Sequence, residues 1–293
     1  MAGFSSTSNI LSCMASGQAN SFNFYKASAD PSAGLAGGWQ EYFSATGSPG
    51  AIPFTGTAGV ATVPTNTTTG ALLPLPEGNV SPQLRYLTAA QVGGTAATLI
   101  PGVAILVDIL LYYPNCSATT SPTILNNTAI LTRYTNGIGV MGICFVNVLQ
   151  TGTTNATVTF TFTADDGSSQ TGALVTAFAG TSTVSYMYGI GNTLSLAQGP
   201  PFIPIPAGHQ GIKSIQSYTV SATQGTTFHF ALVKPLAVLP IATANSYLEK
   251  SFVQPFPSFP QIVDGACLGL ILMPGGALAA NSVLTGHLEY AWG

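Results

Sequence analysis

Charged side chains are scarce in this sequence. The 293 residues include six Lys and Arg and nine Asp and Glu, or 5% of the chain, whereas charged residues make up about 25% of an ordinary soluble domain. The net charge of −3 is carried by so few groups that no cluster of cations is available for a phosphate backbone, which argues against nucleic acid as a partner. Such a composition also gives little repulsion between copies, so it favours a chain that works in an assembly.

The sequence also lacks a recognisable export or membrane segment. No basic residue precedes Lys26 and no continuous apolar run opens the chain, so the N-terminus does not resemble a signal peptide. The most apolar stretch, residues 97–113, contains Pro101 and Asp108 and falls short of the roughly 20 residues that a membrane-spanning helix requires. We therefore expect one or two buried strands there and no membrane partner.

Cysteines are few and widely spaced. The four cysteines are too far apart for a CxxC-type metal site, and without an export signal they are expected to be buried free thiols rather than disulfides. They are Cys13, Cys116, Cys144 and Cys267. We predict no metal ion and no cofactor.

Hydrophobic and aromatic residues, at 46% and 10% of the chain, are abundant enough for a folded core. The clearest local pattern is at residues 157–163, where Val and Phe alternate with Thr, as in a half-buried antiparallel strand. Residues 165–167 then supply a turn, and residues 173–178 can return as the second strand of a hairpin. Similar runs lie at 184–188, 212–220, 226–233, 267–272 and 284–290.

These runs define the predicted fold class. Turn residues separate them, and the prolines near residues 200–206 and at Pro235 exclude helices and are expected in loops or at strand edges. No stretch has the pattern of a long amphipathic helix, and no internal repeat is present. We predict an all-β protein whose residues 83–293 form an antiparallel β-sandwich of jelly-roll-like topology.

Residues 1–82 have a different texture, rich in Gly, Pro, Ser and Thr without a sustained period. A segment of this length without regular structure predicts a long, mostly irregular, extended N-terminal arm. Its isolated aromatic residues indicate that the arm docks, either on its own domain or on a neighbouring subunit. The resulting interface candidates are Phe22, Phe24, Tyr25, Trp39, Tyr42 and Phe43.

Groups that could perform catalysis are isolated from one another. His209 lies in a Gly-rich loop, and His229 and His287 each neighbour apolar residues on predicted strands, where a histidine on the wet face is the expected arrangement. Glu289 shares a strand face with His287, being two residues away. That pairing alone indicates no reaction.

Two further patterns have an ordinary structural explanation. Asp165 and Asp166 could form the carboxylate pair of a glycosidase, but adjacent acids before a glycine are far more typical of a turn. The run GIGVMG at 137–142 matches GxGxxG, yet a strand-like segment follows it where a nucleotide site requires a helix. We therefore predict no catalytic residue and a protein that is not an enzyme.

Asp108 is the one acid within an apolar run. If it is buried it must be paired, because an isolated carboxylate is costly to remove from water. The candidates for this structural ion pair are Arg85 and Arg133.

Several segments resemble tailed-bacteriophage virion structural proteins. They include RYTNGIGVMGICFVNV at 133–148, VTFTFTADDG at 158–167 and IPIPAGHQGIKSIQSYTVS at 203–221, and FALVKPLAVLP at 230–240 and FPQIVDGACLGLIL at 259–272 are similar in style. The resemblance is to head decoration and minor capsid proteins, and it implies a protein that stabilises the particle by binding the major capsid or other virion proteins. It also implies a homo-oligomer, with a trimer favoured, in a virion assembled in the host cytoplasm.

Two alternatives remain open. A virion-surface or tail module that binds host glycans would display exposed aromatic residues near Asp or Asn, with Tyr186, Tyr188 and Trp292 as candidates. An enzyme such as a polysaccharide depolymerase would have to rely on Asp165 and Asp166.

Overall fold

The structure is a computed structural model. It describes residues 3–28, 37–95, 101–119, 123–125, 130–148, 151, 156–175, 185–190, 199–242, 245–253, 259–276 and 282–293. Within these ranges the chain forms one helix and fourteen strands, and every strand pairing is antiparallel. The prediction of an all-β antiparallel fold is confirmed.

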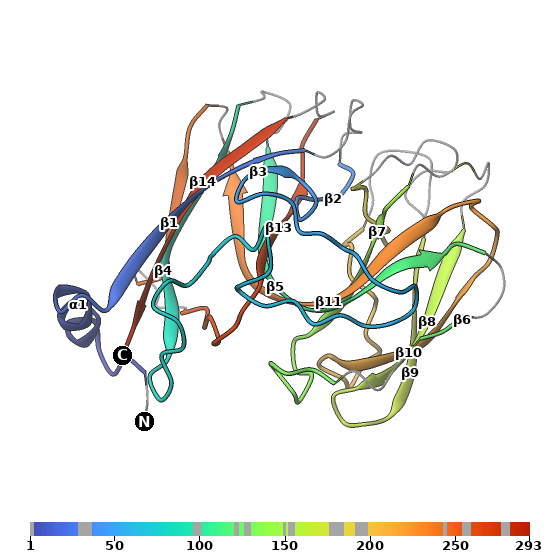
Figure 1. The fold of residues 1–293 in the computed structure, drawn as a ribbon, viewed down its shortest axis with the longest axis horizontal. Coiled ribbons are helices and arrows are strands. Elements are labelled where there is room, and N and C mark those ends of the chain that lie inside the picture. The colour runs from blue at the N-terminus through green and yellow to red at the C-terminus, as the bar shows by residue number, and fades with distance from the viewer. Residues whose placement is uncertain are drawn as a thin grey trace.

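The strands form three sheets (Figure 1). Sheet A has the order β12 (Leu248–Ser251), β4 (Arg85–Gly94), β14 (Val283–Trp292), β1 (Ala19–Ala27) and β3 (Thr46–Ser48). Sheet B has the order β2 (Gln40–Glu41), β13 (Leu268–Met273), β5 (Gly102–Ser117), β11 (Thr227–Ile241) and β7 (Met141–Val146). Sheet C has the order β6 (Thr123–Ile124), β10 (Ile212–Val220), β8 (Thr157–Ala164) and β9 (Ser169–Val175).

The long strands β5 and β11 join the two ends of the molecule. They have 16 and 15 residues and pair along most of their length, with three register shifts. Sheet A packs against one end of this pair and sheet C against the other, so the molecule has two sandwich layers that share sheet B (Figure 1). The structure is therefore an antiparallel β-sandwich, as the sequence predicted, and it is built from three sheets.

Strand β5 contributes to three separate cores, which explains why its sequence is apolar without alternation. Leu106 lies in the core between sheets A and B, called here the A–B core. Leu110 and Tyr113 lie in the core between sheets B and C, the B–C core. Ile105 and Val107 face the opposite side of sheet B, the back core, which side chains of the irregular segment 39–71 cover.

The predicted hairpin at residues 157–178 is largely confirmed. In β8, Val158, Phe160 and Phe162 are fully buried, while the threonines between them are half-buried or exposed. Gly167 adopts a φ of 93° in the turn, which glycine tolerates because it has no Cβ. The return strand β9 begins directly after this turn, earlier than predicted.

Strand β11 continues beyond the predicted end at residue 233 and passes through Pro235 and Pro240. On one side β11 pairs with β7 only from Phe228 to Val233. Beyond that point this side of the strand has no partner strand among the described residues, and a register shift follows Pro235 on the β5 side. A proline without an N–H is tolerated at such a local edge.

Residues 3–82 are not the extended arm that the sequence predicted. Helix α1 (Thr7–Ala15) begins at the N-cap Ser6, whose hydroxyl accepts a 3.1 Å hydrogen bond from the Asn9 N–H. Strand β1 pairs with all nine of its residues to β14. Residues 49–84 contain no named strand, so this part is irregular as expected, but it packs on its own domain.

A buried lysine holds the irregular segment on sheet A. Lys26 of β1 is 1% exposed, and its Nζ donates to the carbonyls of Ala45, Gly50 and Gly70 at 3.4, 2.6 and 3.5 Å. Three acceptors match the three donors of an ammonium group. Burial lowers the pKa of Lys26 to about 8. The contacts span residues 26–70, so they fasten the segment predicted as an arm to the sheet.

Two other expectations can be compared with the structure. All four cysteines are free and buried, as predicted. In the described ranges, no helix is long and apolar enough to cross a membrane.

Candidate functional site

Four of the six interface candidates are core residues of this chain. Phe24 and Tyr42 are buried in the A–B core, and Trp39 and Phe43 in the back core, each at most 7% exposed. Phe24 lies on β1, whereas Trp39, Tyr42 and Phe43 flank the two-residue strand β2. Pairing of these segments in sheets A and B directs the four side chains into the cores. The folded chain therefore does not present these four side chains to a partner.

The other two candidates, Phe22 and Tyr25, lie on β1. Phe22 is half-buried against the A–B core, whereas Tyr25 is 46% exposed on the opposite face. Two-residue alternation of Phe22 and Phe24 with polar neighbours is the signal that could have predicted this strand. This alternation covers only a few residues and the neighbouring residues have no regular period, so the sequence alone does not predict strand β1.

The outer edge of β1 is open. Only Tyr25–Ala27 pair with β3, and from Ala19 to Phe24 no strand pairs with this edge among the described residues. The Tyr25 carbonyl faces β3, and backbone groups of alternate residues point the same way in a strand. Ser21 and Asn23 therefore direct their N–H and C=O groups to the open side.

This edge lacks the usual protection against pairing with another chain. Natural edge strands carry charges, prolines or bulges that discourage such pairing, whereas residues 19–24 have neither charge nor proline and pair with β14 without a register shift. The opposite edge of the same sheet, β12, carries Glu249 and Lys250. In sheet B, Phe202 and Met187 bridge to the edge strand β7. Of these three edges, the β1 edge from Ala19 to Phe24 combines unpaired backbone groups with the absence of charge, proline and register shift.

Of the two predicted partners, Arg133 pairs with Asp108. Its Nε and Nη2 donate to the two carboxylate oxygens at 3.0 Å each, and the Cys267 N–H donates to Oδ1 at 2.9 Å. The guanidinium also donates to the carbonyls of Pro64 and Ile109. Burial raises the pKa of Asp108, while the Arg133 charge and the hydrogen bonds oppose this effect. Every polar atom of the pair thus has a structural use.

Arg85 forms a separate ion-pair centre. Its Nε donates to Glu77 Oε1 at 2.8 Å, its Nη1 to Asp264 Oδ1 at 3.2 Å and its Nη2 to the Gly78 carbonyl at 2.6 Å. The guanidinium carbon lies 5.9 Å from the centre of the Tyr290 ring. The centre fastens the loop at residues 77–82 to the segment around Asp264.

The acids at the β8–β9 turn accept hydrogen bonds from the turn and from the loop that precedes β10. His209 Nδ1 lies 3.9 Å from Asp165 and 3.5 Å from Asp166. Asp165 accepts from the Gln210 N–H at 2.9 Å, and Asp166 accepts from the Ser168 N–H and hydroxyl. The Ser168 donors lower the pKa of Asp166. In the part of the chain that the structure describes, no three His, Cys, Asp or Glu side chains are grouped to hold a metal ion.

His229 is a core residue, contrary to the expectation of a wet face. It is 6% exposed between the rings of Phe54 and Phe145, each centred 5.3 Å from its own. Its Nδ1 accepts a 3.2 Å hydrogen bond from the Asn115 N–H. Burial lowers the pKa of His229 to about 4, so the ring is neutral at pH 7.

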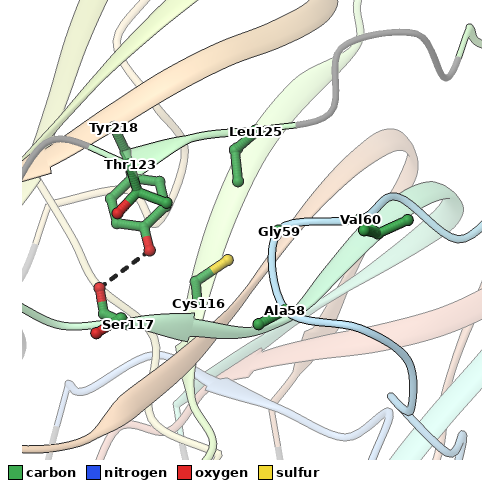
Figure 2. Close-up of a pocket in the computed structure, with 8 residues that line it drawn as sticks. All are labelled: Ala58, Gly59, Val60, Cys116, Ser117, Thr123, Leu125 and Tyr218. Carbon is green, nitrogen blue, oxygen red and sulfur yellow. Dashed lines mark hydrogen bonds between the residues drawn. The ribbon is translucent and has the colours of Figure 1, made fainter.

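An apolar cavity of about 420 Å³ opens where β5, β6 and β10 meet (Figure 2). Tyr218 closes one side of it, with its hydroxyl donating to the Ser117 carbonyl at 3.0 Å. Burial raises the pKa of the Cys116 thiol to about 12, so this sulfur is protonated and a poor nucleophile at neutral pH. Val60 borders the cavity and is 40% exposed. The lining suits an apolar side chain and offers no reactive group.

The predicted glycan-binding aromatics are not exposed. Tyr186 and Tyr188 are 2% and 0% exposed and lie in the B–C core, and Trp292 is half-buried against the A–B core. Tyr186 and Tyr188 pack inside because their segment pairs with β7 at the edge of sheet B and directs both rings into the B–C core. A glycan site, if the chain has one, must use other residues.

Comparisons with known proteins give no close relative. No protein-family model matches the chain, and no curated protein matches it by sequence. Similar solved structures include VP2 of infectious bursal disease virus in a subviral particle, 10% identical over 93% of this chain and 80% of that chain, with a TM-score of 0.22. The Gt strain of that virus gives 9% identity over 94% and 80%, with a TM-score of 0.20. Scores this low do not establish a shared fold.

Proposed function

We propose that the chain is a structural component of a tailed-phage virion, a capsid decoration or cement protein or a minor capsid protein. The observation that carries this proposal is the open, uncharged edge of β1 between Ala19 and Phe24. An edge of this kind is a hazard in a free monomer and a binding site in an assembled one. The proposed role requires protein contacts and involves no reaction.

The physical basis of assembly is strand addition at this edge. A strand from a partner would pair with the outward N–H and C=O groups of Ser21 and Asn23, and it would replace Asn20 Oδ1, which accepts a 2.8 Å hydrogen bond from the Ser21 N–H. Each new hydrogen bond would contribute about 0.5–1.5 kcal/mol. A surface with only 5% charged residues opposes the approach of another copy very little. Repetition of modest contacts over a symmetric shell gives high avidity.

The resemblance in sequence style suggests the partners. We propose a second copy of the chain in a homo-oligomer, with a trimer favoured, and the major capsid or other virion proteins. The location that follows is the virion, assembled in the host cytoplasm.

The experiment alters the edge without altering the sheet. Ser21→Pro removes an N–H that points to the open side and donates to Asn20 Oδ1, so the hydrogen bonds to β14 should remain. Ser21→Thr is the matched control, because it keeps the N–H and adds no charge. We expect both variants to melt cooperatively, and Ser21→Pro to shift the chain from oligomer to monomer in size-exclusion chromatography with light scattering. Ser21→Pro should also fail to cosediment with capsids, whereas Ser21→Thr should behave like the unaltered chain.

A second measurement tests the virion role itself. Purified particles should contain many copies of the chain on a stained gel, as a lattice protein does. An unaltered chain that is monomeric at micromolar concentration and absent from particles would contradict the proposal. So would a Ser21→Pro chain that assembles normally, which would place the contact elsewhere on the surface.

A further inference from the structure

The outer face of sheet A carries a row of polar side chains that core packing does not use. Asn23 of β1, His287 of β14, Gln91 of β4 and Glu249 of β12 lie directly opposite one another across four adjacent strands. Strand alternation places Phe24 in the A–B core, so its neighbour Asn23 and the rest of this row face away from sheet B. A continuous polar row on a charge-poor surface calls for an explanation.

Hydrogen bonds within the row hold its members in place. His287 Nδ1 lies 2.8 Å from Asn23 Oδ1, and its Nε2 lies 3.2 Å from Glu289 Oε1. Gln91 Nε2 donates to Glu249 Oε2 at 2.8 Å. Among the described residues, these contacts use one oxygen of each carboxylate, and the second oxygen can accept a hydrogen bond from a ligand. The row is therefore preorganised, which reduces the cost of ordering side chains on binding.

The face is hollowed beside this row. Two cavities of about 390 and 200 Å³ adjoin each other, since Tyr247 and Thr285 line both. Gly93 lies at the smaller cavity, where a Cβ would come within 3.0 Å of the Tyr247 ring and 2.7 Å of the Ser246 carbonyl. The missing side chain lets the tyrosine lie against β4 and form a wall of the groove.

Two exposed aromatic rings accompany the polar row. Tyr247 is 55% exposed, and its hydroxyl shares a 2.8 Å hydrogen bond with Thr285 Oγ1. Tyr25 is 46% exposed on β1, directly opposite Thr285. A half-exposed tyrosine held by its hydroxyl offers a rigid, flat apolar surface next to polar groups.

We propose that this groove binds a neutral glycan. Asn23, Gln91, Tyr247, Thr285 and His287 line it, and Glu249 lies at its rim. Amide and carboxylate oxygens accept hydrogen bonds from sugar hydroxyls, and a tyrosine ring packs on the apolar face of a sugar ring.

The charges of the groove select against anionic sugars. Glu249 and Glu289 add negative charge, and none of the described residues that line the two cavities is Lys or Arg. The nearby Lys250 is directed elsewhere, since its Nζ donates to the Val238 carbonyl at 3.0 Å and lies over the Phe252 ring. The groove uses the face of the sheet and not its edge, so the inference does not depend on the assembly role.

The test uses the full chain on an array of neutral and acidic oligosaccharides, followed by calorimetric titration of the best neutral sugar. Tyr247→Ala removes the ring from the groove, and we expect affinity to fall about tenfold or more, as loss of an aromatic contact does. Glu249→Gln, which keeps the shape, should weaken binding several-fold. Val60→Ala is the matched control, because it alters an exposed apolar residue at the distant cavity of Figure 2 and should leave the affinity unchanged.

Each possible outcome of these measurements either supports the proposed glycan site or overturns it. Neutral sugars that bind the unaltered chain and the Val60→Ala chain, but bind Tyr247→Ala weakly, support the proposal. Binding of acidic sugars alone, no binding at all, or binding that Tyr247→Ala leaves intact overturns it. Loss of capsid binding in Tyr247→Ala without any sugar binding would also overturn it, since the face would then be a protein interface. Thermal melting of each variant checks that Tyr247→Ala remains folded.

Discussion

Two buried arginines, Arg133 and Arg85, are each neutralised by carboxylates, but the carboxylates differ in their exposure to water. Arg133 pairs with Asp108, and the side chains are 7% and 0% exposed. The Arg85 side chain is also fully buried, but its partners Glu77 and Asp264 are 13% and 25% exposed. In the Arg133 centre, which we call the closed centre, the arginine and its carboxylate are both buried. In the Arg85 centre, which we call the open centre, the carboxylates remain partly exposed to water.

The difference follows from where each centre lies. Asp108 is on β5 between Leu106 of the A–B core and Leu110 of the B–C core, so the pair marks the junction between the two sandwich layers. Arg85 begins β4 at the end of sheet A and reaches into a surface loop. A charge removed from the closed centre leaves its partner without water, whereas a charge removed from the open centre leaves partners that can rehydrate.

Arg133→Met should have the largest effect. It leaves the Asp108 carboxylate buried with one backbone N–H as its remaining donor, and the loss of one partner of a buried pair costs about 3–5 kcal/mol. We expect that decrease in the free energy of unfolding, measured by urea denaturation at pH 7. A decrease below about 1 kcal/mol would show that water reaches Asp108 and that the centre is not closed.

Arg85→Met should cost less, about 2–3 kcal/mol, because the charged hydrogen bonds are lost while Glu77 and Asp264 can turn to solvent. The same urea titration measures it. Lys at this position is the informative control, since it keeps the charge but cannot donate to Glu77, Asp264 and Gly78 with the geometry of a guanidinium. If Arg85→Met destabilised the chain as much as Arg133→Met, exposure of the partners would not explain the difference between the centres.

The double variant Asp108→Asn with Arg133→Met sharpens the comparison. It removes both charges and keeps an acceptor for the Cys267 N–H, although the carbonyls of Pro64 and Ile109 lose their donor. We expect a net loss of about 1–2 kcal/mol, smaller than for Arg133→Met alone, because no charge remains buried without a partner. A double variant as unstable as the single one would mean that the lost carbonyl contacts, and not the isolated carboxylate, dominate the cost.

The sequence predicted the local elements better than their long-range partners. The strand at 157–163 and the strand at 212–220 were identified because β-branched and aromatic residues alternate or cluster between clear turns. Strand β1 was missed because only a few of its residues alternate. Its place in sheet A depends on pairing with β14, which is more than 250 residues away in the chain.

The same limitation applies to the sites. The sequence indicates that Asp108 is paired, but the choice between Arg85 and Arg133 depends on where the strand that begins at Arg85 and the segment around Arg133 lie in the fold. The polar row on sheet A takes its residues from four strands, and only the register of those strands places Asn23 opposite His287 and Gln91 opposite Glu249. Periodicity can assign each residue to a face of its own strand, but it contains no information on the register between distant strands.

The effect that is smallest at pH 7 and grows only in acid concerns a buried group without charge, and it determines how the two arginine centres can be compared in acid. Above pH 6.5 the His229 ring is neutral in both the folded and the unfolded chain, and its contribution to stability is complete. Burial lowers the pKa of His229 from 6.5 to about 4 in the folded chain. Between these values the unfolded chain takes up a proton that the folded chain does not, so the free energy of unfolding falls as the pH falls.

At its steepest this decrease is about 1.4 kcal/mol per pH unit, the value for one proton. His229→Phe should remove it, because Phe fits between Phe54 and Phe145 and does not titrate, although the Asn115 N–H loses its acceptor and the variant is somewhat less stable at every pH. Urea titrations of both chains from pH 7.5 to pH 4 measure the slopes. Equal slopes would mean that His229 takes up its proton in the folded chain as readily as in the unfolded chain, whereas any slope that remains in His229→Phe belongs to other groups of the chain.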